Sequence, residues 1–216
     1  MKNKKTYYQL ILDRSGSMSS CIEETVTGVN SQIVQIRELA KQFPEQELLT
    51  SFNLFNHNLT TVWDRLGSTE IKELSYPDFN PDGNTALLDA IGLTIRHLQD
   101  TIGEEVARDE ASVVVVIFTD GYENASTQFK LKQISSLIKE LELTGRWSFS
   151  YIGATLDAIE IAITLNIKRS NSRHFDVRDS AMEHNRVSGS MRSYMVEKRE
   201  GRIKQDFLED EEPKKV

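Results

Sequence analysis

The sequence predicts an α/β fold: a Rossmann-like, doubly wound and mainly parallel sheet with one antiparallel strand and helices on both faces. Three observations predict it. Short apolar runs alternate with longer segments in which apolar residues recur every three or four positions, as strands and helices do in α/β proteins. Residues 113–118 are apolar throughout and mostly β-branched, which is typical of a strand buried on both faces. Residues 48–55 and 59–64 are two strand-like runs joined by a short polar turn, which indicates an antiparallel hairpin.

The first half of the chain begins with residues 7–12, a short apolar run that stops at polar, glycine-containing sequence. Such a run is typical of a buried central strand. From Ile22 the apolar residues keep a helical spacing up to Pro44, which predicts an amphipathic helix that ends before the proline. The hairpin follows. Residues 67–83 contain two prolines and two glycines, so we expect mostly a connecting loop there.

The second half continues the alternation of helices and strands. Thr85 opens a helix whose apolar face extends to Ile102. After the central strand, the pattern predicts in order a helix at residues 128–143, a strand at 147–152, a helix at 156–165 and a short last strand at 173–177. Strands that alternate with helices imply parallel pairing, with the helices covering both faces of the sheet.

The character of the chain changes after residue 177. Residues 179–216 are crowded with charges of both signs. A weak apolar stripe predicts one last helix, and its members are Ala181, Met182, Val187, Met191, Met195 and Phe207. We therefore expect one domain at residues 1–178, followed at residues 179–216 by a charged C-terminal helix and a disordered tail.

Composition and charge exclude several classes of partner. The formal net charge of −7 over 216 residues builds no broad positive field for phosphates, so we expect no nucleic-acid partner. No stretch approaches the roughly 20 apolar residues that a membrane span needs. The basic N-terminus is followed by neither a long apolar segment nor a small-residue cleavage site. We expect a cytoplasmic protein without a membrane partner.

Three polar clusters carry the chemistry of this sequence. The first holds Asp13, Ser15 and Ser17, directly after the first predicted strand. The second ends in Thr85, just before a helix, and the third holds Asp120, directly after the central strand. In open α/β sheets, ligands bind beyond the carboxyl ends of the strands, where the strand order reverses. We therefore expect all three clusters to face one crevice.

The donor atoms of these clusters indicate the kind of metal. Two carboxylates and three hydroxyls are hard oxygen donors, and the set contains neither imidazole nor thiolate. Such a set suits Mg²⁺, Mn²⁺ or Ca²⁺ and is poor for Zn²⁺ or Cu²⁺. Neutral hydroxyls also neutralise less of the metal's positive charge than a cage of carboxylates would. The bound ion, for which we expect Mg²⁺, should then favour one more anionic oxygen from outside.

This set resembles the metal-ion-dependent adhesion site (MIDAS) of von Willebrand factor A (VWA) domains. Its three parts occur in the family's order: Asp13-x-Ser15-x-Ser17, then Gly-Asn-Thr-Ala-Leu-Leu-Asp-Ala at residues 83–90, then Phe-Thr-Asp-Gly at residues 118–121. The resemblance covers residues 6–177. Each part alone is also typical of a turn or a helix cap, whereas their joint occurrence is a strong signal.

The resemblance implies a VWA fold without catalytic activity. It implies that Ser15, Ser17 and Thr85 contact the metal directly, and that Asp13 and Asp120 do so directly or through water. A glutamate or aspartate of a protein partner would complete the octahedron. Similar proteins of the bacterial, intracellular type imply an adaptor role beside an ATPase or within a multi-protein assembly.

Two other classes of function stay open. Asp13 could serve a Mg²⁺-dependent phosphotransferase or hydrolase, although serines stand where such enzymes usually carry a second acid. The chain could also be a structural subunit whose metal only steadies the loops. A phosphate cradle for nucleotides is absent from the sequence. Tyr122, Glu123 and Asn124 follow the third cluster, and we expect them at the rim of the crevice, where they would help to select the partner.

Overall fold

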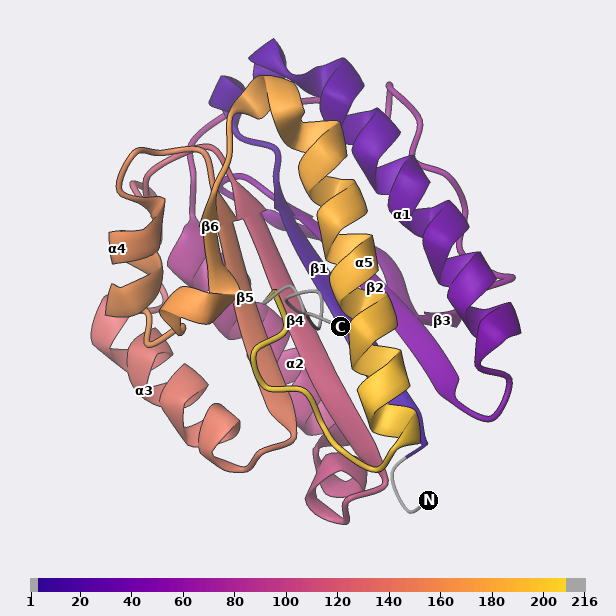
Figure 1. The fold of residues 1–216 in the computed structure, drawn as a ribbon. Helices are drawn as coiled ribbons and strands as arrows, with labels where there is room; N and C mark the ends of the chain where they lie inside the picture. The colour runs from indigo at the N-terminus through magenta and orange to yellow at the C-terminus, as the bar shows by residue number, and fades with distance from the viewer. Residues whose placement is uncertain (1–3, 209–216) are drawn as a thin grey trace, which may run out of the picture.

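A six-stranded sheet forms the centre of the computed structural model, which describes residues 4–208 (Figure 1). The strand order is β3-β2-β1-β4-β5-β6. Neighbouring strands are parallel, except that β2 and β3 form an antiparallel pair. The predicted mainly parallel, doubly wound sheet with one antiparallel strand is thereby confirmed. The strands are β1 (Lys5–Asp13), β2 (Glu47–Phe55), β3 (Leu59–Gly67), β4 (Ala111–Thr119), β5 (Trp147–Gly153) and β6 (Ser172–His174).

Helices cover both faces of this sheet. α1 (Ile22–Gln42) and α5 (Ser180–Arg199) lie side by side on one face (Figure 1). α2 (Leu87–Ala107), α3 (Leu131–Leu143) and α4 (Ala158–Thr164) cover the other. Within the described part of the chain, no helix combines the length and apolar character needed to cross a membrane. Three short 3-10 helices complete the fold: η1 (Gly16–Ser20), η2 (Arg169–Asn171) and η3 (Val177–Asp179).

The alternation of strand side chains divides the core into two layers. Leu10 and Leu12 of β1 pack in the layer with α1 and α5. Ile11, which lies between them in sequence, packs in the layer with α2, α3 and α4, because successive strand residues point to opposite faces. Every residue of β4 is buried, as predicted for its continuous apolar run.

α2 and α3, like α4, begin later than their apolar patterns predict. α2 begins at Leu87 instead of residue 85, and the backbone N–H of Thr85 donates to Asn124 Oδ1. α3 begins at Leu131 instead of residue 128, and the N–H groups of Gln128 and Phe129 donate to a carboxylate on α2. In both cases residues just before the helix donate to a side chain from another part of the chain.

The C-terminal helix is built into the main core. Val187, Met191 and Met195 of α5 belong to the same apolar layer as Leu10 and Leu12. Beyond the helix, Phe207 returns to the sheet and is fully buried in that layer. The expected helix is present. Residues 179–208, which we expected to follow the domain, contribute to its core. The tail expected at the end of the chain lies outside the described residues from position 209 onward.

The carboxyl ends of β1 and β4 lie next to each other at the point where the strand order reverses. β1 is the strand that pairs with both β2 and β4, so the chain builds outward from β1 first to one side and then to the other. This reversal is the usual position of a ligand site in a doubly wound sheet. Asp13 ends β1, and Asp120 follows the last residue of β4.

Candidate metal centre

The five residues expected to hold a metal lie together at this reversal point. Asp13, Ser15 and Thr85 are buried, whereas Ser17 is exposed. The hydroxyl oxygens of Ser15 and Ser17 are 3.2 Å apart. The Ser17 hydroxyl donates a hydrogen bond of 2.7 Å to Asp120 Oδ1. The structure thus brings the first and third sequence clusters into direct contact, although they are about a hundred residues apart.

Gly121 marks the point on which the ligand oxygens converge. A Cβ atom placed on this glycine would lie 3.1 Å from Thr85 Oγ1, 3.6 Å from Ser17 Oγ and 3.8 Å from Asp13 Oδ2. Three oxygens from two separate segments therefore lie around one small space beside a third segment. A side chain at position 121 would enter that space, so the glycine keeps it open.

Asp13 is a buried carboxylate held by neutral donors. The Ser15 N–H donates to Oδ1 at 2.7 Å, and the Thr119 hydroxyl donates to Oδ2 at 2.6 Å. Burial nevertheless raises the pKa of Asp13 to about 6. Burial also raises the pKa of Asp120. No cationic side chain is among the groups that act on either carboxyl, so a bound cation would stabilise both in their ionised form.

Backbone hydrogen bonds join the first cluster to the loop that carries Thr85. The Gly16 N–H donates to the Gly83 carbonyl at 3.0 Å, and the Asp82 N–H donates to the Arg14 carbonyl at 3.0 Å. These two bonds cross-link the loops in a fixed register. The backbone segments that carry the serine and threonine side chains are therefore held against each other.

The side chains of Asn124 and Glu123 accept hydrogen bonds from backbone N–H groups of the loops around the site. Asn124 accepts the Thr85 N–H at Oδ1, and its own N–H donates to the Thr85 carbonyl. Glu123 accepts N–H groups from Leu88, Ala125 and Ser126 with its two carboxylate oxygens. Both side chains therefore position the loops, and their expected part in partner selection stays a prediction.

Tyr122 and Asn124 are the members of that trio that face solvent. Tyr122 is 56% exposed, and Asp157, in the loop between β5 and α4, raises the pKa of its hydroxyl. Of the three residues expected at the rim, an incoming partner would therefore meet these two.

Sequence reasoning missed the role of Asp89. Its carboxylate accepts the N–H groups of Thr127, Gln128 and Phe129 at 2.8–2.9 Å. Asp89 therefore ties the start of α2 to the loop that follows β4. The available signal was an acidic residue in the otherwise apolar first turn of α2, four residues after Thr85.

The donor set fits a hard divalent cation. Two carboxylates and three hydroxyls supply oxygen alone, as Mg²⁺, Mn²⁺ and Ca²⁺ prefer. Across the described residues, no group of three or more histidine, cysteine or acidic side chains is placed to hold a metal. The candidate centre differs from such groups because hydroxyls make up most of its ligands. Its metal-binding role remains a prediction.

Comparisons with known proteins find relatives through structure. No protein-family model matches the chain, and no curated protein matches it. A von Willebrand factor type A protein from Catenulispora acidiphila superimposes with a TM-score of 0.61 and 15% identity, over 89% of this chain and 43% of that protein. The chain thus spans less than half the length of that protein.

Two further solved structures show the same likeness. The manganese-loaded TRAP protein of Plasmodium vivax has a TM-score of 0.55 and 16% identity, over 84% of this chain and 72% of that one. The pilus adhesin SpaC from Lactobacillus rhamnosus GG has a TM-score of 0.66 and 12% identity, over 92% of this chain and 31% of the adhesin. Together with the sheet order and the placement of the helices, these likenesses show that the chain has the fold of a von Willebrand factor type A domain.

Proposed function

We propose that this chain is a protein-binding module that holds one Mg²⁺ ion and uses it to bind a carboxylate of a partner protein. The observation that carries the proposal is the convergence of Asp13, Ser17 and Thr85 oxygens on the space beside Gly121. Ser15 and Asp120 join the same cluster through hydrogen bonds to Ser17. A structural neighbour whose name describes it as manganese-loaded supports a divalent ion in this fold.

Charge explains why such a site would recognise an acid. The two carboxylates together balance the charge of a divalent cation, and the three hydroxyls add no charge. A divalent cation held by these residues would favour one more anionic oxygen from outside. When bound, Mg²⁺ would supply the electrostatic attraction. The chain's own residues position the ligands, through Thr119 below Asp13 and Asn124 beside Thr85.

The alternative functions have less support. A phosphotransferase that used Asp13 as its nucleophile would usually carry a second acid close by, at the places that Ser15 and Ser17 occupy. A purely structural metal would not need Ser17 and Tyr122 exposed at the mouth of the site. We therefore favour binding over catalysis. We further propose that the chain acts as an adaptor in the cytoplasm, beside an ATPase or within a multi-protein assembly.

Selection from a random peptide display library tests the function without a known partner. Peptides captured by the immobilised protein in Mg²⁺ and released by EDTA should each contain an aspartate or a glutamate. Thr85→Val removes one ligand oxygen at almost constant shape and should abolish this capture. Thr61→Val makes the same change at an exposed position of β3 and should leave capture intact. Enriched peptides that lack an acid, or that stay bound in EDTA, would refute the proposal.

A further inference from the structure

A polar pocket of about 250 Å³ lies beside the candidate metal centre. The β2–β3 turn, the first two turns of α2 and the loop before α3 enclose it. Its lining residues are His57, Asn58, Leu59, Ala86, Asp89, Ala90, Leu93 and Gln128. None of them is a predicted metal ligand, and the proposed function does not use the pocket.

The loop that carries Thr85 forms the wall between the pocket and the metal centre. Thr85 belongs to the centre, and the next residue, Ala86, lines the pocket. The Ala86 N–H donates to the Asn56 carbonyl at 2.8 Å, which fixes the β2–β3 turn against this loop. The His57 ring lies so close to Gly83 that a Cβ there would be 2.3 Å from Nδ1. A partner segment of a few residues can therefore reach both sites.

The chemistry of the lining favours a long side chain with a cationic end. Leu59, Ala90 and Leu93 supply an aliphatic wall. Asn58 and Gln128 are exposed at the rim and carry amide oxygens that can accept hydrogen bonds. No lysine or arginine is among the described residues that line the pocket, so an anionic group would find no counter-ion there.

Asp89 contributes the negative charge of the pocket. Its oxygens accept backbone N–H groups from residues 127–129, which hold the carboxylate in place without neutralising its net charge. Arg96, one turn further along α2 than Leu93, stacks over the Phe129 ring and does not line the pocket. Among the described lining residues Asp89 is the acidic one, and its net charge favours a cation over an anion in the pocket.

We infer that this pocket is a second binding site, which takes the basic side chain of a lysine or arginine from the same partner segment whose carboxylate binds the metal. The inference rests on the proposed function for the identity of the partner. The aliphatic stem of the basic residue packs against the leucines, and its charged end meets the rim amides and the field of Asp89. The partner segment thus carries an acidic and a basic residue a few positions apart.

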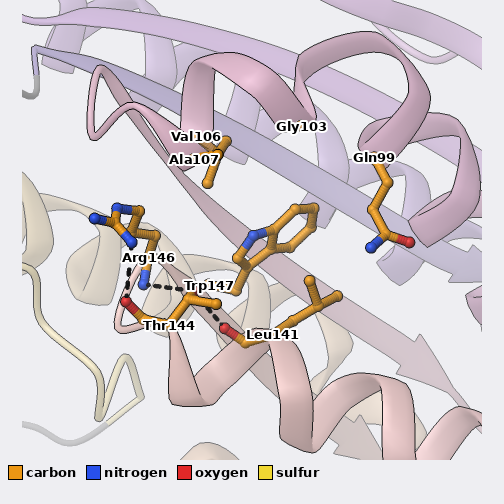
Figure 2. Close-up of a pocket in the computed structure, with 8 residues that line it drawn as sticks. All are labelled: Gln99, Gly103, Val106, Ala107, Leu141, Thr144, Arg146 and Trp147. Atoms are coloured by element: carbon orange, nitrogen blue, oxygen red, sulfur yellow. Dashed lines mark hydrogen bonds between the residues drawn. The ribbon is translucent and has the colours of Figure 1, made fainter.

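A second pocket of similar size provides an internal control. It has a volume of about 270 Å³ and lies at the opposite end of the sheet, between the C-terminal halves of α2 and α3 (Figure 2). Trp147 and Leu141 line it, and Arg146 stands at one side (Figure 2). Gln99 is exposed at its edge, as Gln128 is at the edge of the first pocket. The same Gln→Lys substitution can therefore be made at both pockets.

Two synthetic peptides measure the contribution of the cation. N-acetyl-Asp-Ala-Lys-amide and its neutral analogue with norleucine in place of lysine have almost the same shape. In Mg²⁺, NMR titration should show the lysine peptide binding about three to five times more tightly, the size of a partly exposed charge contact. Gln128→Lys should remove this preference, because it places a positive charge at the rim. Gln99→Lys should leave the preference unchanged.

A second probe separates this inference from the proposed function. N-acetyl-lysine N-methylamide contains no carboxylate, and in EDTA it should still shift the amide signals of Ala86 and Gln128 in the unmodified protein. If the norleucine peptide shows no Mg²⁺-dependent binding but this shift occurs, the proposed function fails and the pocket for the basic side chain stands. Equal binding of the two peptides, equal effects of the two Gln→Lys variants, or no shift with the lysine derivative would overturn the inference.

Discussion

At the scale of single residues, the candidate centre depends on the lack of a side chain at Gly121 as much as on the oxygen atoms of its neighbours. Gly121 has no side chain, and the space this leaves is surrounded by the oxygens of Thr85, Ser17 and Asp13. The φ angle of Gly121 is not in the left-handed region. The glycine is thus required here for space, and an alanine would be compatible with the backbone.

Gly121→Ala should therefore block metal binding without unfolding the protein. Its methyl group would sit about 3.1 Å from Thr85 Oγ1, in the space that we assign to the ion. We expect at least a tenfold loss of Mg²⁺ affinity by calorimetry, with an unfolding free energy within about 1 kcal/mol of the original. Gly189→Ala, at a helical position where a Cβ meets nothing within 4 Å, is the matched control. Full Mg²⁺ affinity in Gly121→Ala would show that the ion binds elsewhere.

Most of the candidate site could be predicted from the sequence, whereas its supports could not. Asp13 ends a strand, Ser15 and Asp120 lie just beyond strand ends, and strand ends are readable from apolar runs. The roles of Asn124 and Asp89 depend on hydrogen bonds across 39 residues for Asn124 and up to 40 for Asp89. Side chains of this type are equally common in ordinary loops and helix starts, so no local pattern distinguishes them.

At the scale of elements, α5 shows the largest difference between sequence and structure. Its weak apolar stripe predicted a charged helix that follows the main domain, but several of its polar residues are buried with partners. Lys198 donates to Thr6 Oγ1, Ser112 Oγ and the Lys5 carbonyl at 2.6–2.7 Å. Glu183 is buried between Arg173 and Arg186. Hydrophobic periodicity cannot reveal burial of this kind, because the compensating groups lie far away in sequence.

The close approach of α1 and α5 gives a test of this packing. A Cβ on Gly28 of α1 would lie 2.4 Å from His184 Cδ2 on α5. Gly28→Ala should therefore destabilise the protein by about 1–3 kcal/mol, since overpacking outweighs the gain in helix propensity. Gly103→Ala on α2, where a Cβ meets nothing within 4 Å, should stabilise it by about 0.5–1 kcal/mol. Urea unfolding measures both, and stabilisation by Gly28→Ala would contradict the contact.

At the scale of the whole molecule, the packing of α5 makes stability depend on pH. His184 is fully buried, and its ring stacks on Phe118 with the ring centroids 4.2 Å apart. Its Nδ1 atom lies 2.5 Å from Gln32 Nε2. Burial lowers the pKa of His184 from 6.5 to about 3. Between these two values the unfolded chain binds a proton that the folded protein does not. Stability therefore falls as the pH falls through this window.

Acidification from pH 7 to pH 5 should cost about 2 kcal/mol of stability through His184 alone. Asp13 acts in the opposite direction, because burial raises its pKa to about 6 in the folded state. The informative quantity is therefore the difference between the unmodified protein and His184→Gln, measured by urea unfolding at both pH values in EDTA. We expect the unmodified protein to lose about 2 kcal/mol more than the variant. Equal losses would mean that His184 is not held neutral in the fold.

The most direct test of the whole account is isothermal titration calorimetry of the protein with Mg²⁺ and Mn²⁺. We predict one divalent ion bound per chain. Asp13→Ala and Asp120→Ala should each abolish the binding while the circular dichroism spectrum of the folded protein is retained. The absence of binding to the unmodified protein, or binding that survives in both variants, would contradict the metal centre and the function built on it.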